Sequence, residues 1–143
     1  MLPPRILAVD DAPEILALVV KILTSQGYLV LTAPNGPAAM AACHQVNGEI
    51  DLLLTDIMMP GISGVELAEN LTASYPAIPV LLISGQYEES VVMNCVTNRR
   101  FRLLAKPFLP QALLEAVTER LAQRAPRRKS VGSQTDYAAK KSA

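Results

Sequence analysis

Residues 52–61 read LLLTDIMMPG, an apolar run that ends in an acid and is followed by Met-Met-Pro-Gly. Three successive leucines predict a strand buried on both faces, because a half-exposed strand alternates apolar and polar residues. Asp56 is the first charged residue after this strand, so we expect it at the edge of the core. A carboxylate in that place can cap a turn, ligate a metal or act as a nucleophile, and residues elsewhere in the chain must distinguish these roles.

Apolar runs alternate with helical patterns on both sides of this stretch. The expected strands cover residues 5–10, 28–32, 51–55, 78–83 and 101–105. The expected helices run from Asp11 to Gly27, over 37–46, onward from Gly64, over 88–98 and over 110–123. Five strand–helix units of this kind predict an α/β protein, in which helices cover both faces of a parallel sheet through right-handed crossovers.

Two of these helices carry recognisable start signals. Asp11 can cap the first helix, with Pro13 in its first turn and Glu14 three residues further on. Asn35-Gly36 opens the second helix. Asp11 is therefore either a helix cap or a functional acid.

The chain has 143 residues, half of them apolar, which is enough to form the core of one domain. Its charge is distributed unevenly. Residues 1–119 hold 6 Lys and Arg against 12 Asp and Glu, whereas residues 120–143 hold 7 against 1. The basic end lacks the interleaved aromatic residues of a nucleic-acid arm. We expect a folded domain over 1–124 and a disordered, solvated tail over 125–143, with no direct DNA binding.

The sequence shows no sign of export or of membrane insertion. Its first residues lack the basic start and apolar stretch of a signal peptide, and no run approaches the ~18 apolar residues of a membrane span. Cys43 and Cys95 lie in helical patterns without the spacing of metal ligands. We therefore expect a cytoplasmic protein with two reduced, buried cysteines.

Every expected strand except the second ends in a polar functional group. These groups are Asp10 and Asp11, Asp56, Ser84 and Lys106. Each has a simpler interpretation alone, as a cap, turn or loop residue. The carboxyl ends of parallel strands meet at one edge of a sheet, however, so we expect the five together. Three crowded carboxylates require a cation, for which Mg²⁺ is suited, while a lysine and a hydroxyl suit phosphate oxygens.

Four motifs in this order resemble a response-regulator receiver domain. They are VDD at 9–11, LLLTDIMMPGISG at 52–64, LLISG at 81–85 and AKPF at 105–108. The resemblance covers residues 5 to about 123. It implies a flavodoxin-like, doubly wound (βα)5 fold, a three-layer sandwich whose parallel sheet has the strand order 2-1-3-4-5.

The resemblance also implies roles for individual residues. Asp56 would be the phosphoacceptor, which attacks the phosphohistidine of a histidine kinase or phosphotransfer protein. Asp11 would bind Mg²⁺ directly and Asp10 largely through water, with Asp56 and the backbone carbonyl of Met58 as further ligands. Such a protein is a signalling phosphoacceptor and not an enzyme.

Two further residues would act on the phosphoryl group once it has arrived. Lys106 would pair with its oxygens, and the Ser84 hydroxyl would donate a hydrogen bond to one of them. The resemblance implies a cis peptide bond between Lys106 and Pro107.

The chain departs from the family pattern at Leu103, three residues before the lysine, where receivers usually carry Tyr or Phe. A receiver-like scaffold that binds partners without a phosphorylation switch therefore stays open. Nearby, Arg99, Arg100 and Arg102 make a basic spot, which is either a partner surface or a solvated loop.

Two other classes of protein fit less well. A haloacid-dehalogenase-type phosphatase also uses a strand-end Asp and Mg²⁺, but it has a second Asp two residues later, where this chain has Met58. A nucleotide-binding fold needs a glycine-rich phosphate loop, and neither G-x-G-x-x-G nor G-x-x-x-x-G-K-[ST] occurs.

The expected function is therefore that of a stand-alone response regulator, a monomer or weak dimer. Only about 20 residues follow the last expected helix, too few for a DNA-binding output domain. We expect the phosphorylated chain to signal in trans, through a separate protein target.

Overall fold

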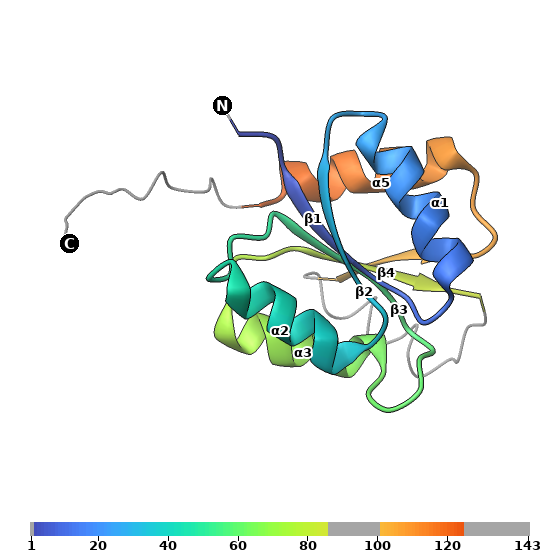
Figure 1. Cartoon of the computed structure of the whole chain (residues 1–143). Coiled ribbons are helices and arrows are strands. Elements are labelled where there is room, and N and C mark those ends of the chain that lie inside the picture. The colour runs from blue at the N-terminus through green and yellow to red at the C-terminus, as the bar shows by residue number, and fades with distance from the viewer. Residues whose placement is uncertain (1, 86–100, 125–143) are drawn as a thin grey trace.

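The computed structural model describes residues 2–85 and 101–124 (Figure 1). The strands are β1 (Arg5–Val9), β2 (Leu29–Ala33), β3 (Leu52–Asp56), β4 (Val80–Ser84) and β5 (Phe101–Ala105). The helices are α1 (Pro13–Thr24), α2 (Gly36–Gln45), α3 (Gly64–Ser74) and α5 (Pro110–Ala122). The helix expected over 88–98, Cys95 and the expected tail over 125–143 lie outside the described residues.

All neighbouring strands are parallel, and their order is β2-β1-β3-β4-β5, which confirms the expected sheet. The chain passes from β1 outward to β2 and then returns to place β3 on the other side of β1. The order of the strands therefore reverses between β1 and β3. In open α/β sheets, binding sites form beyond the carboxyl ends of the strands at such a point.

Helices cover both faces of the sheet, with α1 and α5 on one face and α2 and α3 on the other (Figure 1). The three leucines of β3 are divided between the two faces. Leu53 belongs to the apolar cluster under α2 and α3, whereas Leu52 and Leu54 belong to the cluster under α1 and α5. All three are at most 1% exposed, which confirms that β3 is buried on both faces.

The starts of the helices differ from the expectation at one point. The residue that caps α1 is Ala12, without a side-chain hydrogen bond, so of the two roles left open for Asp11 the helix cap is excluded. Asp10 instead accepts a hydrogen bond from Ala12 N (2.9 Å), and Asp11 remains exposed. The side chain of Asn35 caps α2 as predicted, by accepting from Ala38 N (2.9 Å).

Two smaller expectations concern the cysteines and the membrane. Cys43 is fully buried on α2, and burial raises the pKa of its thiol. Among the described residues, no helix combines the length and the apolar character that spanning a bilayer requires.

Candidate functional site

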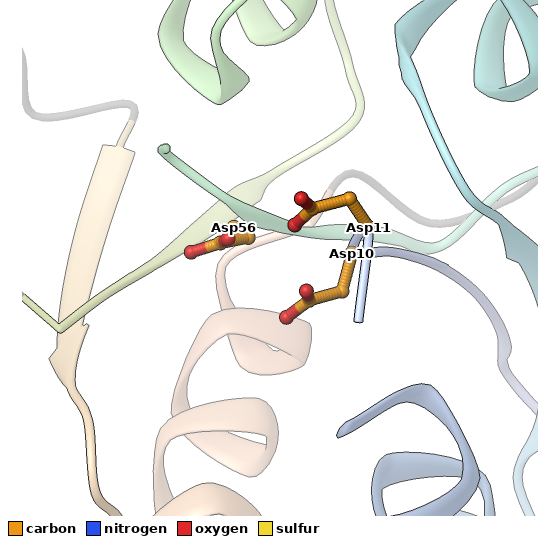
Figure 2. Close-up of side chains that lie close together, drawn as sticks. All are labelled: Asp10, Asp11 and Asp56. Atoms are coloured by element: carbon orange, nitrogen blue, oxygen red, sulfur yellow. The ribbon is translucent and has the colours of Figure 1, made fainter. Parts of the chain in front are cut away.

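The carboxyl ends of β1 and β3 bring three acids together. Asp10 and Asp11 follow β1, and Asp56 is the last residue of β3 (Figure 2). Each can offer one carboxylate oxygen such that the three oxygens lie within 4.8 Å of one another. Asp10 and Asp56 are 4% and 6% exposed, whereas Asp11 is open to solvent. The predicted acid cluster therefore forms, with one member accessible from outside.

Lys106 follows β5 and reaches into this cluster. Its Nζ donates a hydrogen bond to Asp10 Oδ2 (3.0 Å) and lies 3.4 Å from Asp56 Oδ1. Its backbone N donates to Ser84 O (2.8 Å), and the following bond to Pro107 is cis, as expected. The lysine ammonium is thus placed between two of the three carboxylates.

Ser84 ends β4 and is buried, at 1% exposed. It lies one residue beyond Ile83, which is the β4 partner of Asp56 in the sheet register. Ser84 thus occupies the same edge of the sheet as the acids and Lys106. All five polar groups predicted from the strand ends are therefore at this edge.

The site has an excess of negative charge. Burial raises the pKa of Asp56 above its ordinary value, and the charge of Asp10 adds to this effect, while Lys106 opposes it. Burial by itself lowers the pKa of Lys106, but the hydrogen bond to Asp10 and the charge of Asp56 outweigh it, so this pKa is raised. A second cation would relieve the repulsion that the single lysine leaves among three acids.

The donor groups fit Mg²⁺, which prefers oxygen ligands from one or two carboxylates and retains several waters. Asp11 supplies an exposed carboxylate, and Asp10 and Asp56 supply two more. Met58 lies in the loop after β3, two residues past Asp56, and its side chain is 53% exposed. Its backbone carbonyl remains a predicted ligand.

Three residues near the site or its strand were not identified from the sequence. The Thr55 hydroxyl donates to the backbone carbonyl of Asp56, and Gly64 packs against the same peptide. Asp51, just before β3, is buried in addition to Asp10 and Asp56. None of Thr55, Gly64 and Asp51 has a local sequence signal for its contact. The capping box of Ser63 and Glu66 at the start of α3, also not identified, does have one, in the form S-x-x-E.

Leu103, at the position where receivers usually carry Tyr or Phe, lies within the sheet. Leu103 is the β5 partner of Leu82 and packs, partly buried, against the apolar cluster under α2 and α3. Arg102, its neighbour, pairs with Glu119 of α5. Arg99 and Arg100, the other members of the expected basic spot, lie outside the described residues.

The fold and the site define a doubly wound, flavodoxin-like protein with an acid cluster and a lysine at its topological switch point. Comparison with known proteins supports this description of the fold and the site. The family described as "Response regulator receiver domain" matches residues 6–118. The chain therefore belongs to the response-regulator receiver family, whose members are phosphoacceptor signalling domains and not classical enzymes.

Individual relatives support this assignment. The chain is similar to the sensor kinase CckA of Brucella abortus, with 31% identity over 116 residues that cover 81% of this chain and 12% of the kinase. The structure resembles chemotaxis protein CheY4 of Vibrio cholerae, with a TM-score of 0.75, 27% identity, and coverage of 82% of this chain and 98% of that one.

A third relative comes from a complex. It belongs to the CheX–CheY–BeF3–Mg complex of Borrelia burgdorferi, with a TM-score of 0.75, 26% identity, and coverage of 82% of this chain and 89% of that chain. The curated relatives are longer proteins: the chain spans 12% of CckA and 50% of the response regulator MtrA of Mycolicibacterium smegmatis.

Proposed function

We propose that this receiver domain accepts a phosphoryl group on Asp56 from the phosphohistidine of a histidine kinase or of a phosphotransfer protein. The observation that carries the proposal is the position of Asp56, buried at the end of β3 within reach of two other acids and of Lys106. The likeness to a protein whose complex contains BeF3 and Mg²⁺ supports it. Asp10, Asp11, Asp56 and the Met58 carbonyl would hold the metal ion.

The chemistry needs alignment and charge neutralisation more than covalent assistance. A carboxylate oxygen of Asp56 attacks phosphorus, and an O–P bond forms as the N–P bond of the phosphohistidine breaks. The bonding electrons leave with the imidazole nitrogen, which takes up a proton from water. When bound, Mg²⁺ supplies positive charge for the acids and the phosphoryl oxygens.

Lys106 and Ser84 would stabilise the product. The Lys106 ammonium already lies 3.4 Å from Asp56 Oδ1, so it can follow the negative charge onto the phosphoryl oxygens. The Ser84 hydroxyl would donate a hydrogen bond to one of these oxygens. Both residues stand on neighbouring strand ends that the hydrogen bond from Lys106 N to Ser84 O joins.

Labelling with radioactive acetyl phosphate in the presence of Mg²⁺ tests this function. We expect wild type to incorporate phosphate and Asp56→Asn to lose at least a hundredfold of the label. Asp51→Asn is the matched control, because it neutralises another buried acid beside the same strand and should keep the label. Absence of label in wild type, or equal label in wild type and Asp56→Asn, would overturn the proposal.

We further propose that the phosphorylated domain signals in trans, by binding a separate protein target.

Leu103 favours a second candidate, a partner-binding domain without a phosphorylation switch, because a leucine cannot form the polar contact of an aromatic hydroxyl. Leu103→Tyr discriminates between them in binding measurements with the cognate histidine kinase or phosphotransfer protein. If the aromatic is what the switch lacks, acetyl phosphate should change the affinity of Leu103→Tyr severalfold more than that of wild type. An identical response in both proteins would exclude this explanation.

A further inference from the structure

The first residue of α3 lies against the peptide of the proposed phosphoacceptor. A β-carbon added to Gly64 would stand 2.0 Å from the backbone oxygen of Asp56 and 2.8 Å from its carbonyl carbon. It would also stand 3.0 Å from the Cα of Ile57. All three atoms belong to the backbone at the end of β3, which cannot turn aside as a flexible side chain can.

This close contact also closes the loop that follows β3. The backbone N of Gly64 donates to Ile57 O (2.9 Å), so residues 57–64 return to the strand that they left. Ile57 N in turn donates to Ile83 O of β4 (2.9 Å). The loop carries Met58 and is therefore attached at its beginning to the sheet and at its end to α3 (Figure 1).

Thr55 contacts the backbone carbonyl of Asp56, the group against which Gly64 lies, from within β3. Its Oγ1 donates to Asp56 O (3.0 Å), and the residue is completely buried. The peptide that carries the Asp56 side chain is thus held by a hydroxyl of β3 and by the backbone of α3. Neither contact involves the carboxylate itself.

We propose that Gly64 is a positioning residue for the metal site, because the absence of its side chain lets α3 hold Asp56 and the Met58 loop in register with Asp10 and Asp11. A β-carbon would have to move from 2.0 Å to at least the 3.0 Å of real contacts, a displacement of about 1 Å. Either the end of β3 moves, which displaces the Asp56 carboxylate, or α3 moves, which displaces the loop. A displacement of ~1 Å in a catalytic site can reduce its function by ~100-fold. This inference rests on the proposed use of these residues as Mg²⁺ ligands.

Calorimetric titration with Mg²⁺ alone tests the positioning role without a phosphodonor. We expect Gly64→Ala to raise the Mg²⁺ dissociation constant at least tenfold, at a temperature where circular dichroism shows the variant fully folded. Gly27→Ala is the matched control: it strains a glycine of φ +87° at the far edge of the sheet, with no atom within 4 Å of the new β-carbon. Its dissociation constant should stay within twofold of wild type. An unchanged constant in folded Gly64→Ala would overturn the proposal.

Thr55→Val is the second variant. It tests whether the position of the Asp56 peptide governs Mg²⁺ affinity, also where Gly64→Ala does not fold. It keeps the shape of the side chain and removes the hydrogen bond to Asp56 O, so we expect about threefold weaker Mg²⁺ binding. Unaltered binding would overturn the proposal in that case. The two proposed roles are tested separately. Wild type that binds Mg²⁺ without being labelled overturns the phosphoacceptor role of Asp56, whereas labelled wild type with normal Mg²⁺ binding in Gly64→Ala overturns the positioning role of Gly64.

Discussion

The two ends of β3 each carry a buried acid, and the two acids have different surroundings. Asp51, just before the strand, is 4% exposed, and Asp56, at its end, is 6% exposed. Asp51 Oδ2 accepts a hydrogen bond from Arg5 N (2.8 Å), and its Oδ1 lies 3.7 Å from Arg124 Nε. Asp56 lies among other acids and shares a single lysine with Asp10.

The comparison shows that burial alone does not identify a functional carboxylate. At the amino edge of the sheet, a backbone N–H and a guanidinium satisfy Asp51, so it serves the fold. At the carboxyl edge, Asp56 meets Asp10 and Asp11, and this crowding creates a demand for a cation. The distinction lies in the charge of the neighbours, and it can be tested by removing each acid in turn.

Removal of Asp51 should cause the largest loss of stability. Asp51→Ala leaves the partly buried Arg5 N–H without its acceptor and Arg124 without its carboxylate, so we expect the free energy of unfolding to fall by about 2–3 kcal/mol. Urea unfolding measures this change. Labelling of Asp56 by acetyl phosphate should continue at a temperature where the variant is folded. A loss of label with intact folding would refute the division between the two ends.

Mg²⁺ should stabilise the protein through one end of the strand only. A ligand at 100 times its dissociation constant adds about 2.7 kcal/mol to the free energy of unfolding, provided that it binds the native state alone. We expect this gain in wild type and in Asp51→Ala, measured by urea unfolding with and without MgCl₂. Asp56→Asn lacks one carboxylate ligand and should gain clearly less. Equal gains in wild type and Asp56→Asn would place the ion elsewhere.

Asp56→Asn should have the opposite effect on stability from Asp51→Ala when no metal is present. The raised pKa of Asp56 means that its ionised form destabilises the fold at neutral pH, so neutral asparagine should raise the free energy of unfolding, by an amount on the order of 1 kcal/mol. Urea unfolding in EDTA at pH 7 provides the measurement. A decrease would show that the contact with Lys106 outweighs burial and the charge of Asp10.

The difference in the free energy of unfolding between Asp56→Asn and wild type should depend on pH, which is the smallest effect expected here and the one that identifies its cause. A carboxyl whose pKa is raised in the folded state contributes its full stability below its ordinary value of 3.8 and loses it as the pH rises through the folded-state pKa. The advantage of Asp56→Asn should therefore grow as the pH rises from 3.8 through the folded-state pKa of Asp56. Below pH 3.8, where the carboxyl takes up its proton in both the folded and the unfolded chain, wild type and variant should converge. A constant difference across this range would contradict the stated cause.

Local sequence pattern was sufficient for the strands and for the identity of the strand-end groups. The run of leucines in β3 and the apolar runs elsewhere predicted the parallel sheet, because a strand buried on both faces has no polar alternation. The order of the strands came from family resemblance, since periodicity does not state which strands are neighbours.

The difference at the start of α1 is local, whereas the omissions have a common physical origin in contacts between distant residues. Asp11 has the sequence of a helix cap, but Asp10 accepts the hydrogen bond from Ala12 N. Asp51 and Asp56 flank the same leucines, and the sequence singled out only Asp56, as the acid at the carboxyl end of the strand; no local signal indicated that Asp51 is buried and paired with Arg5 N and Arg124. The role of Gly64 depends on how closely α3 approaches β3, which no local signal reports.

The contact between Lys106 and Asp10 joins residues that are 96 positions apart in the chain. During synthesis on the ribosome, the three acids therefore emerge well before the lysine that partly neutralises them. A nascent chain that ends before β5 contains the three acids without this lysine, and a contact between residues so far apart in the chain must overcome a loop-closure entropy before it forms. The proposed phosphoacceptor would thus lack its neighbouring ammonium group in any nascent chain that ends before β5.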